Sequence, residues 1–448
     1  MKKNWFKHGT VLILLAFMFL AMACGSSQPA VRSPSAYDNH ISIGALYYLA
    51  NIYDRAIAEF TEAIKLSPTT AAPYNLRGLS YSASGQYDAA IADFTKVIEL
   101  SPQSTDAYDN RGWAYYQKGN SAQAIAEFNA ALKIDPNYES ARENLDYVNN
   151  IVALTQAITD NPNAAEGYSD RGLAYHRQGE YDKAIVDFTK ALSIEESPIS
   201  YNNRAWAYAN KGEHEKAIAD FTSAIDIWPD VGQLYSNRGS EYEAIEDYDS
   251  AFWDYNQAIA LDPDDADFYT ERGWLFANIA GMYEEAISDF TDALTIDPQH
   301  DVAYNGRGWS YYHTGVYDKA ILDFTQAVRI DPAYTNAYEG RGWSYYYQGS
   351  YDRAIADATK EIELNESSST GYYIRGLAYH KKGSNDPAIT DFTKAIELNE
   401  DHASAYYARG QVYESKKNTA KAIADYKSAL AINAEYADAL AAMKRLGQ

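Results

Sequence analysis

The sequence repeats itself about every 34 residues, and this periodicity limits the possible folds more than any other feature of the chain. Ten copies contain an arginine followed by glycine or, once, by alanine. These arginines are Arg77, Arg111, Arg171, Arg204, Arg238, Arg272, Arg307, Arg341, Arg375 and Arg409. A fixed period of about 20 to 50 residues is typical of solenoids, whose repeats pack mainly on their neighbours. The 448 residues therefore need no single large core.

Each copy predicts two helices. A tyrosine lies three residues before every arginine and an aromatic residue four residues after it, and these spacings place all three side chains on one helical face. A turn with glycine follows, such as "QGSYD", and then a second segment with an alanine in every copy, for example Ala354. Most copies end with proline, as at Pro298 and Pro332, which ends one helix and begins the next. We therefore expect an all-α fold.

This pattern of aromatic, glycine, tyrosine, alanine, aromatic, alanine and proline resembles the tetratricopeptide repeat (TPR), a helix-turn-helix unit of 34 residues. The resemblance covers about residues 41–436. It implies a right-handed superhelical solenoid of helix-turn-helix TPR repeats, with a concave groove lined mainly by the first helix of each repeat.

Two departures from the family pattern occur together. The family usually has leucine where the arginines lie, and an apolar or aromatic residue where this chain has an acid sixteen residues later, or seventeen at Asp289. We predict that each arginine pairs with the acid of its own repeat and that these pairs are structural. The predicted pairs include Arg307 with Asp323, Arg341 with Asp357 and Arg375 with Asp391. Glu59 is left over, because the first partial repeat has Ile43 at the arginine position.

The N-terminus differs from the repeats. Lysines precede an apolar segment, residues 11–23, which is too short to span a bilayer and typical of a signal-peptide core. The segment ends in "LAMAC", which resembles the lipobox of bacterial lipoproteins, and this resemblance implies a lipid on Cys24. The alternative is an ordinary cleaved signal with a cysteine near the cut. Because Gly25 is not the aspartate that favours inner-membrane retention in Gram-negative bacteria, we expect an outer-membrane anchor if the cell has such a membrane.

The sequence predicts five segments. Residues 1–23 form a lipoprotein signal peptide, and residues 24–40, rich in serine and proline, form a flexible tether. A first TPR array, 41–150, ends in a capping helix, because the copy between Asn137 and Pro162 is eight residues short and lacks both arginine and acid. A second array covers 151–436, and residues 437–448 end a C-terminal capping helix.

The position two residues after each arginine is the strongest candidate for partner binding, because it tends to face the groove in this family. It carries five tryptophans, and further aromatic residues occupy nearby groove positions. The candidates are Trp113, Trp206, Trp274, Trp309, Trp343, Tyr116, Tyr312, Tyr346, Tyr347, Tyr373 and Tyr407. Clustered aromatic side chains favour a protein or peptide partner. Envelope glycan is the alternative ligand, and simple packing between neighbouring helices is the alternative role.

Composition and motifs argue against other classes of function. The net charge of −24 disfavours nucleic acid. His176, His313 and His380 lie in different repeats without the spacing of metal ligands, and the sequence contains no phosphate-binding loop or nucleophile elbow. We therefore expect no cofactor, no metal and no enzymatic activity. The hypothesis is a lipid-anchored scaffold that binds proteins at the bacterial cell envelope; its oligomeric state and its partner stay open.

Overall fold

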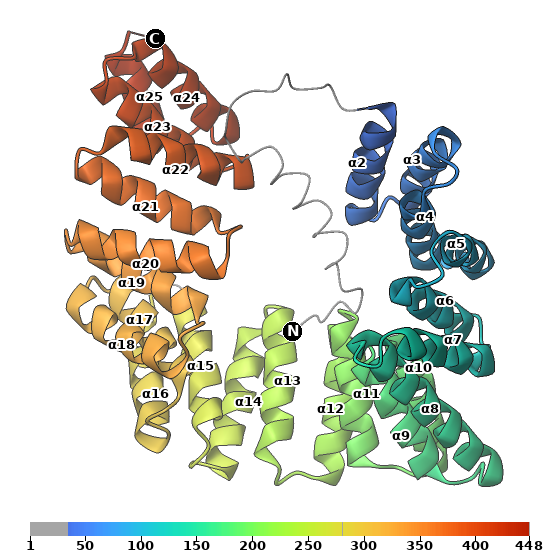
Figure 1. Cartoon of the computed structure of the whole chain (residues 1–448). Coiled ribbons are helices and arrows are strands. Elements are labelled where there is room, and N and C mark those ends of the chain that lie inside the picture. The colour runs from blue at the N-terminus through green and yellow to red at the C-terminus, as the bar shows by residue number, and fades with distance from the viewer. Residues whose placement is uncertain (1–34, 280, 448) are drawn as a thin grey trace. The chain divides into compact units, whose positions relative to one another are not determined.

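The computed structural model describes residues 35–279 and 281–447, and this part of the chain contains 24 α-helices and no strand. Successive helices pair as helix-turn-helix units that form a solenoid-like array (Figure 1). The chain divides into a first compact unit that ends at Lys211 and a second that begins at Gly212. The all-α, helix-turn-helix fold predicted from the repeats is confirmed.

The helices of the first unit are α2 (Ala36–Leu49), α3 (Tyr53–Leu66), α4 (Ala71–Ala83), α5 (Tyr87–Leu100), α6 (Thr105–Gln117), α7 (Ser121–Ile134), α8 (Glu139–Asp160), α9 (Ala165–Arg177), α10 (Tyr181–Ile194) and α11 (Pro198–Asn210). Those of the second unit are α12 (His214–Ile227), α13 (Gly232–Ala244), α14 (Tyr248–Leu261), α15 (Ala266–Asn278), α16 (Tyr283–Ile296), α17 (Asp301–His313), α18 (Tyr317–Ile330), α19 (Thr335–Tyr347), α20 (Tyr351–Leu364), α21 (Ser369–Lys381), α22 (Asn385–Leu398), α23 (Ala403–Ser415), α24 (Thr419–Ile432) and α25 (Ala437–Arg445).

The core of a typical repeat is a glycine of the first helix packed against an aromatic ring of the second. In the α17–α18 repeat, a Cβ atom built on Gly308 would lie 2.8 Å from Cε1 of Phe324, closer than real side chains approach. Phe324 is fully buried, together with Ala320 and Ala327 of the same helix. In repeats with this arrangement, the glycine beside the arginine is therefore needed for the close approach of two helices.

The α19–α20 repeat breaks this rule. Ala358 replaces the phenylalanine, and a Cβ atom on Gly342 would meet its nearest neighbours, Asp357 Cβ and Ile374 Cγ2, at 3.7 Å. Ile374 of α21 is fully buried, so a larger side chain on the next helix fills the space that the missing ring leaves. The packing is thus maintained by a different pair of residues.

These two glycines form a matched pair for a stability test. Gly308→Ala should destabilise the protein by roughly 1–3 kcal/mol, because the new methyl group overlaps the ring of Phe324. Gly342→Ala should be neutral or stabilising by up to about 1 kcal/mol, since the site has room and alanine favours helix. Thermal and urea unfolding of the two variants would check this. Equal destabilisation by both substitutions would contradict the conclusion that overlap with the ring of Phe324 destabilises Gly308→Ala.

A typical repeat arginine makes a three-point contact that joins two repeats. Arg341 Nε and Nη2 each donate to a carboxylate oxygen of Asp357 at 2.7 Å, and its Nη1 donates to Thr325 Oγ1 at 3.1 Å. Asp357 lies in the same repeat, on α20, whereas Thr325 lies on α18 of the preceding repeat. The guanidinium also lies 5.4 Å from the ring centroid of Tyr338. The arginine thus fixes the position of one repeat on the next.

The predicted pairing within the repeat is present in both units. The ion pairs are Arg77–Asp93, Arg111–Glu127, Arg171–Asp187, Arg238–Asp254, Arg272–Asp289, Arg307–Asp323, Arg341–Asp357, Arg375–Asp391 and Arg409–Asp425. Arg204 and Asp220 lie in different units. Glu59, which the sequence left without a partner, contacts Nδ1 of His40 at 2.6 Å. Histidine one helical turn before Ile43 therefore takes the place of the missing arginine.

Removing one member of a pair should cost far more than removing both. Burial raises the pKa of Asp357 by more than Arg341 lowers it. The cost of burying the carboxylate thus offsets most of its attraction to Arg341, and the net stabilisation from the pair is small. Arg341→Leu alone leaves the carboxylate buried and unpaired, and should lower the free energy of unfolding by about 3–5 kcal/mol. Arg341→Leu with Asp357→Leu should recover much of this loss, as a double-mutant cycle of unfolding would show. Thr325→Val, which removes one hydrogen bond, is the mild control, and additive losses from the two leucine substitutions would argue against the pair.

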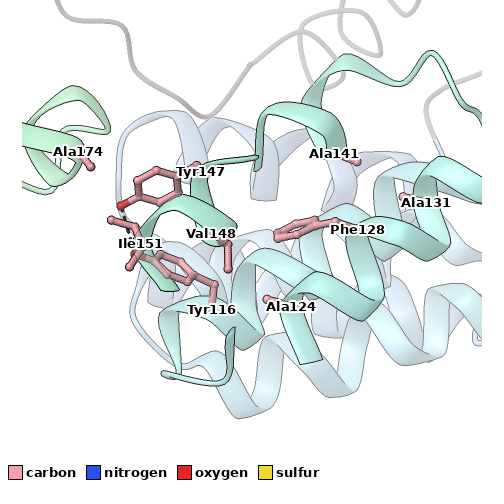
Figure 2. Packing of buried hydrophobic residues seen from close by; sticks show 9 residues of the cluster. All are labelled: Tyr116, Ala124, Phe128, Ala131, Ala141, Tyr147, Val148, Ile151 and Ala174. Atoms are coloured by element: carbon pink, nitrogen blue, oxygen red, sulfur yellow. Dashed lines mark hydrogen bonds between the residues drawn. The ribbon is translucent and has the colours of Figure 1, made fainter. Parts of the chain in front are cut away.

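The short copy in the first unit lies in one long helix, α8. This helix has 22 residues and runs unbroken through residue 150, where the sequence placed the junction between two arrays. Tyr147, Val148 and Ile151 of α8 pack into a buried cluster with Phe128 (Figure 2). The short copy is therefore part of one long helix. The division into two TPR arrays, 41–150 and 151–436, stays a prediction.

The predictions for the N-terminal segment concern residues that lie partly outside the described part of the chain. The predicted signal peptide and the predicted lipidation site, Cys24, lie in residues 1–34, and so does most of the predicted tether. Residues 36–40 of that tether are helical, since α2 begins at Ala36. Ser35 caps the helix: its hydroxyl accepts from the amide of Asp38, whose carboxylate accepts from the Ser35 amide in return.

Candidate functional site

Six of the predicted groove residues lie together in the second unit. Trp309 and Tyr312 come from α17, Trp343, Tyr346 and Tyr347 from α19, and Tyr373 from α21. These three helices are the first helices of consecutive repeats, so the same helical face recurs three times. We call this set the aromatic ladder.

The rings of the ladder form a continuous series of contacts. The centroids of Trp309 and Tyr312 are 5.3 Å apart, and Tyr312 is 5.9 Å from Tyr347 of the next repeat. Tyr347 lies 6.0 Å from Trp343, which lies 5.9 Å from Tyr373 on α21. Contacts at these distances are favourable for aromatic pairs. The ladder therefore extends across three repeats without a gap.

Neighbouring residues that the sequence analysis missed extend the ladder. Tyr317, the first residue of α18, stacks on Tyr347 with their ring centroids 5.6 Å apart. Tyr283, the first residue of α16, stacks on His313 with a centroid distance of 4.9 Å. His402 lies 4.7 Å from Tyr373. The signal for these tyrosines was available: a tyrosine followed by an acid begins the second helix in many copies, and its ring meets the end of the first helix.

The ladder is partly exposed and held in place by polar groups. Tyr347 is 53% exposed, whereas Trp309 and Trp343 are half-buried. Trp309 Nε1 donates to Asn336 Oδ1 at 2.7 Å, and Glu339 lies one helical turn before Trp343 on α19. The indole ring of Trp309 therefore has a fixed orientation before any partner binds, which lowers the entropic cost of binding.

The other predicted groove residues lie elsewhere. Trp274 packs edge-on against Phe290 at 5.4 Å, and Tyr407 packs against Tyr426 and Tyr436. Trp206 is half-buried on α11 of the first unit, and Trp113 packs on Tyr116 and Tyr147 in that unit.

Tyr116 is not a surface residue. It is 6% exposed, and its hydroxyl lies 3.1 Å from that of Tyr147 within the buried cluster of the first unit (Figure 2). The long helix α8 brings Tyr147 over it, which the family pattern did not predict. The assignment of Tyr116 to a binding surface is therefore wrong.

Two carboxyl groups with unusual surroundings adjoin the ladder. The pKa of Glu361 on α20 is raised to about 7, mainly by burial and in smaller part by the negative charge of Glu339 on α19. Burial also raises the pKa of Glu339. His313 and His402 are shifted in the direction that favours the neutral ring, because burial lowers the pKa of each. Near neutral pH this region therefore disfavours charge of either sign on its own side chains.

Two further findings concern metals and membranes. In the part of the chain that the structure describes, no group of three His, Cys, Asp or Glu side chains is placed to hold a metal ion. Among the same residues, no helix combines the length and apolar character needed to cross a bilayer.

Comparison with solved structures finds distant likenesses. One is to YrrB, described as a TPR protein with an unusual peptide-binding site: the identity is 26%, the match covers 42% of this chain and 97% of YrrB, and the TM-score is 0.37. Another is to the Cut9–Hcn1 hetero-tetramer of the APC/C, with 15% identity, 97% and 98% of the two chains covered, and a TM-score of 0.47. A third is to yeast Tom70, with 18% identity, 88% and 92% covered, and a TM-score of 0.41. We infer nothing about partners from these likenesses.

Family models give a more specific result. No curated protein sequence matches this chain. Models described as tetratricopeptide repeat match residues 75–139, 165–198, 198–231, 232–265, 254–288, 280–335 and 403–436, and a model described as TPR repeat matches 376–417. Together they cover more than half of the chain, in agreement with its paired helices. The chain belongs to the tetratricopeptide repeat family.

Proposed function

We propose that this chain is a non-catalytic, lipid-anchored TPR scaffold, and that its aromatic ladder binds a peptide segment of a partner protein at the bacterial cell envelope. The continuity of the ladder across α17, α19 and α21 is the observation that carries the proposal. Large, pre-oriented aromatic rings supply contact area at low entropic cost. The regular spacing of the repeats would hold an extended peptide along successive rings.

Folding alone does not explain the tryptophans of the ladder. The equivalent position, two residues after the arginine, is Ser240 in α13, Leu377 in α21 and Gln411 in α23. Each of these helices carries the same arginine–acid pair as α17 and α19. A repeat therefore forms without tryptophan there, which supports a role in binding.

Envelope glycan is a second candidate ligand. The hydrogen bond from Trp309 to Asn336 places a polar group beside an aromatic ring, and Glu339 lies one helical turn before Trp343. Sugars stack on aromatic rings and need hydrogen-bond partners at the ring edge, so these polar neighbours favour glycan. We prefer a peptide because the ladder spans three repeats, whereas a sugar site needs one or two rings.

A pulldown from the envelope fraction of the source cell tests the ladder. The bait is the chain from residue 24 with Cys24→Ser, beside a Trp343→Ala, Tyr347→Ala variant. We expect the bait to retain a partner protein and the variant to lose it, because these rings join α17 to α21. Trp253→Ala is the matched control, since Trp253 on α14 is 53% exposed and lies outside the ladder.

Circular dichroism and thermal unfolding would verify that every variant is folded. Equal retention by the bait and the double variant would overturn the proposal. Retention of purified peptidoglycan or other envelope glycan, with loss in the double variant, would support the second candidate instead.

The lipid anchor rests on the sequence "LAMAC" and on the apolar segment before it. We expect Cys24 to be the first residue of the mature protein and to carry a diacylglyceryl group. Mass spectrometry of the protein extracted from membranes would show this added mass, and Cys24→Ser should release the protein from the membrane fraction. An unmodified N-terminus on the membrane-extracted protein would refute the anchor. Sucrose-gradient separation of the membranes then tests the outer-membrane location.

A further inference from the structure

The first described helix, α2, exposes an apolar face. The structure describes all 14 of its residues, and the exposed ones follow each other at spacings of three or four, on one side of the helix. They are Ala36, Asn39, Ile43, Leu46 and Leu49, and we call this set the α2 stripe. No member of the stripe carries a charge. The next helix, α3, exposes the charged residues Asp54, Arg55, Glu62 and Lys65.

In other repeats, the preceding repeat covers the face on which the stripe lies. Leu46 comes three residues after Ile43, which takes the arginine position, and its equivalents Ala114 and Leu275 are fully buried. Ala114 packs on Phe94, which lies on the second helix of the preceding repeat. No helix precedes α2 among the described residues, and Leu46 is 63% exposed. The stripe is therefore a packing face without its usual partner.

The first and last described helices differ in what they expose. The last one, α25, exposes Asp438, Lys444 and Arg445, as expected of a helix that closes a repeat array with a polar outer face. In α2 the side opposite the stripe is also apolar, since Gly44 and Ala45 are buried in the first repeat. A helix that is apolar all round is normally buried. We therefore infer that α2 has a cover in its natural setting.

A second copy of this chain is a poor cover. A helix of 14 residues is about 21 Å long and about 10 Å wide, so the stripe offers an area of about 200 Å². A stable protein interface buries about 800 Å² on each partner. A lipid bilayer needs no matching surface, because exposed apolar side chains can enter its interface at any point. The stripe therefore fits lipid better than it fits protein.

The position of α2 in the sequence would bring it close to lipid. Ser35, the N-cap of α2, lies eleven residues after the proposed lipidation site, Cys24. A chain of eleven residues spans at most about 40 Å. A lipid on Cys24 would hold α2 near the bilayer at a high effective concentration. A contact too weak to bind a free protein becomes sufficient under that condition.

We propose that the α2 stripe lies on the lipid bilayer that carries the anchor, with Ile43, Leu46 and Leu49 inserted at its interface. This inference rests on the proposed lipid anchor and adds a second membrane contact to it. Apolar burial carries the contact, because the net charge of −24 gives no attraction to anionic lipids. The two contacts together fix the orientation of the first repeat on the membrane, which a single anchor point does not.

Spin labelling on vesicles tests the contact without the natural lipid. The chain from residue 24, with Cys24→Ser, carries an N-terminal histidine tag that binds nickel-chelating lipid in vesicles of phosphatidylcholine and phosphatidylethanolamine. Asn39→Cys then provides the single thiol for a nitroxide within the stripe. On vesicles we expect this label to collide more with oxygen and several-fold less with water-soluble chromium oxalate than in solution. Ala58→Cys is the matched control, since Ala58 is exposed on α3 and should keep its solution values.

A second set of variants tests whether the stripe causes the protection. Ile43→Asn with Leu46→Asn should return the label at residue 39 to its solution values. Both residues are exposed, so the helix should still form, as circular dichroism would verify. If the double variant does not fold, Leu46→Asn alone changes the most exposed residue of the stripe and should weaken the protection.

Three results would overturn the proposal. The first is a label at residue 39 that keeps its solution values on vesicles, and the second is protection that persists in the folded double variant. The third is protection without vesicles that grows with protein concentration, because a second copy would then be the cover. Mass spectrometry of Cys24 separates this proposal from the anchor. A lipidated Cys24 with a water-exposed label would refute the contact of α2 and leave the anchor, whereas an unmodified Cys24 would refute the anchor whatever the label reports.

Discussion

The hydrogen bonds of the repeat arginine are the interaction on which this structure depends. One guanidinium group binds the carboxylate of its own second helix and the threonine of the preceding one, as Arg341 does with Asp357 and Thr325. Because buried ion pairs add little net stability, their contribution is better described as geometric. Three directed hydrogen bonds fix the angle and the height of each repeat relative to its neighbour. A solenoid built on apolar contacts alone would have more freedom at these interfaces.

The aromatic ladder is a consequence of this regular spacing. Rings on α17, α19 and α21 meet at 5.9 Å from one repeat to the next, which requires that consecutive first helices keep the same rotation and separation. The arginine and the glycine beside it occupy the face that packs on the second helix. The position two residues later is left for other tasks. Recognition and folding therefore use different faces of the same short helix.

Much of the fold was predictable from one sequence, because the pattern is repeated and each copy tests the others. The ion pairs followed from two substitutions that occur together. The threonine contact was missed although its signal is present: the short copy has Ala153 in place of the acid but keeps Thr155, which binds Arg171 of the next repeat. The last repeat has Lys427 at the threonine position, and the segment after it has Met443 where the next repeat arginine would lie. Tyr116 was misplaced because the length of α8 depends on packing that no family pattern encodes.

The α19–α21 region shows how a repeat can change without losing its packing. Ala358 and Ile374 exchange a large and a small side chain across the interface, and Glu361 and Gly371 do the same with a carboxyl group. The first exchange preserves an apolar contact and needs no function to explain it. The second introduces a carboxyl oxygen that is buried without a donor among the described residues, so apolar packing alone does not account for it.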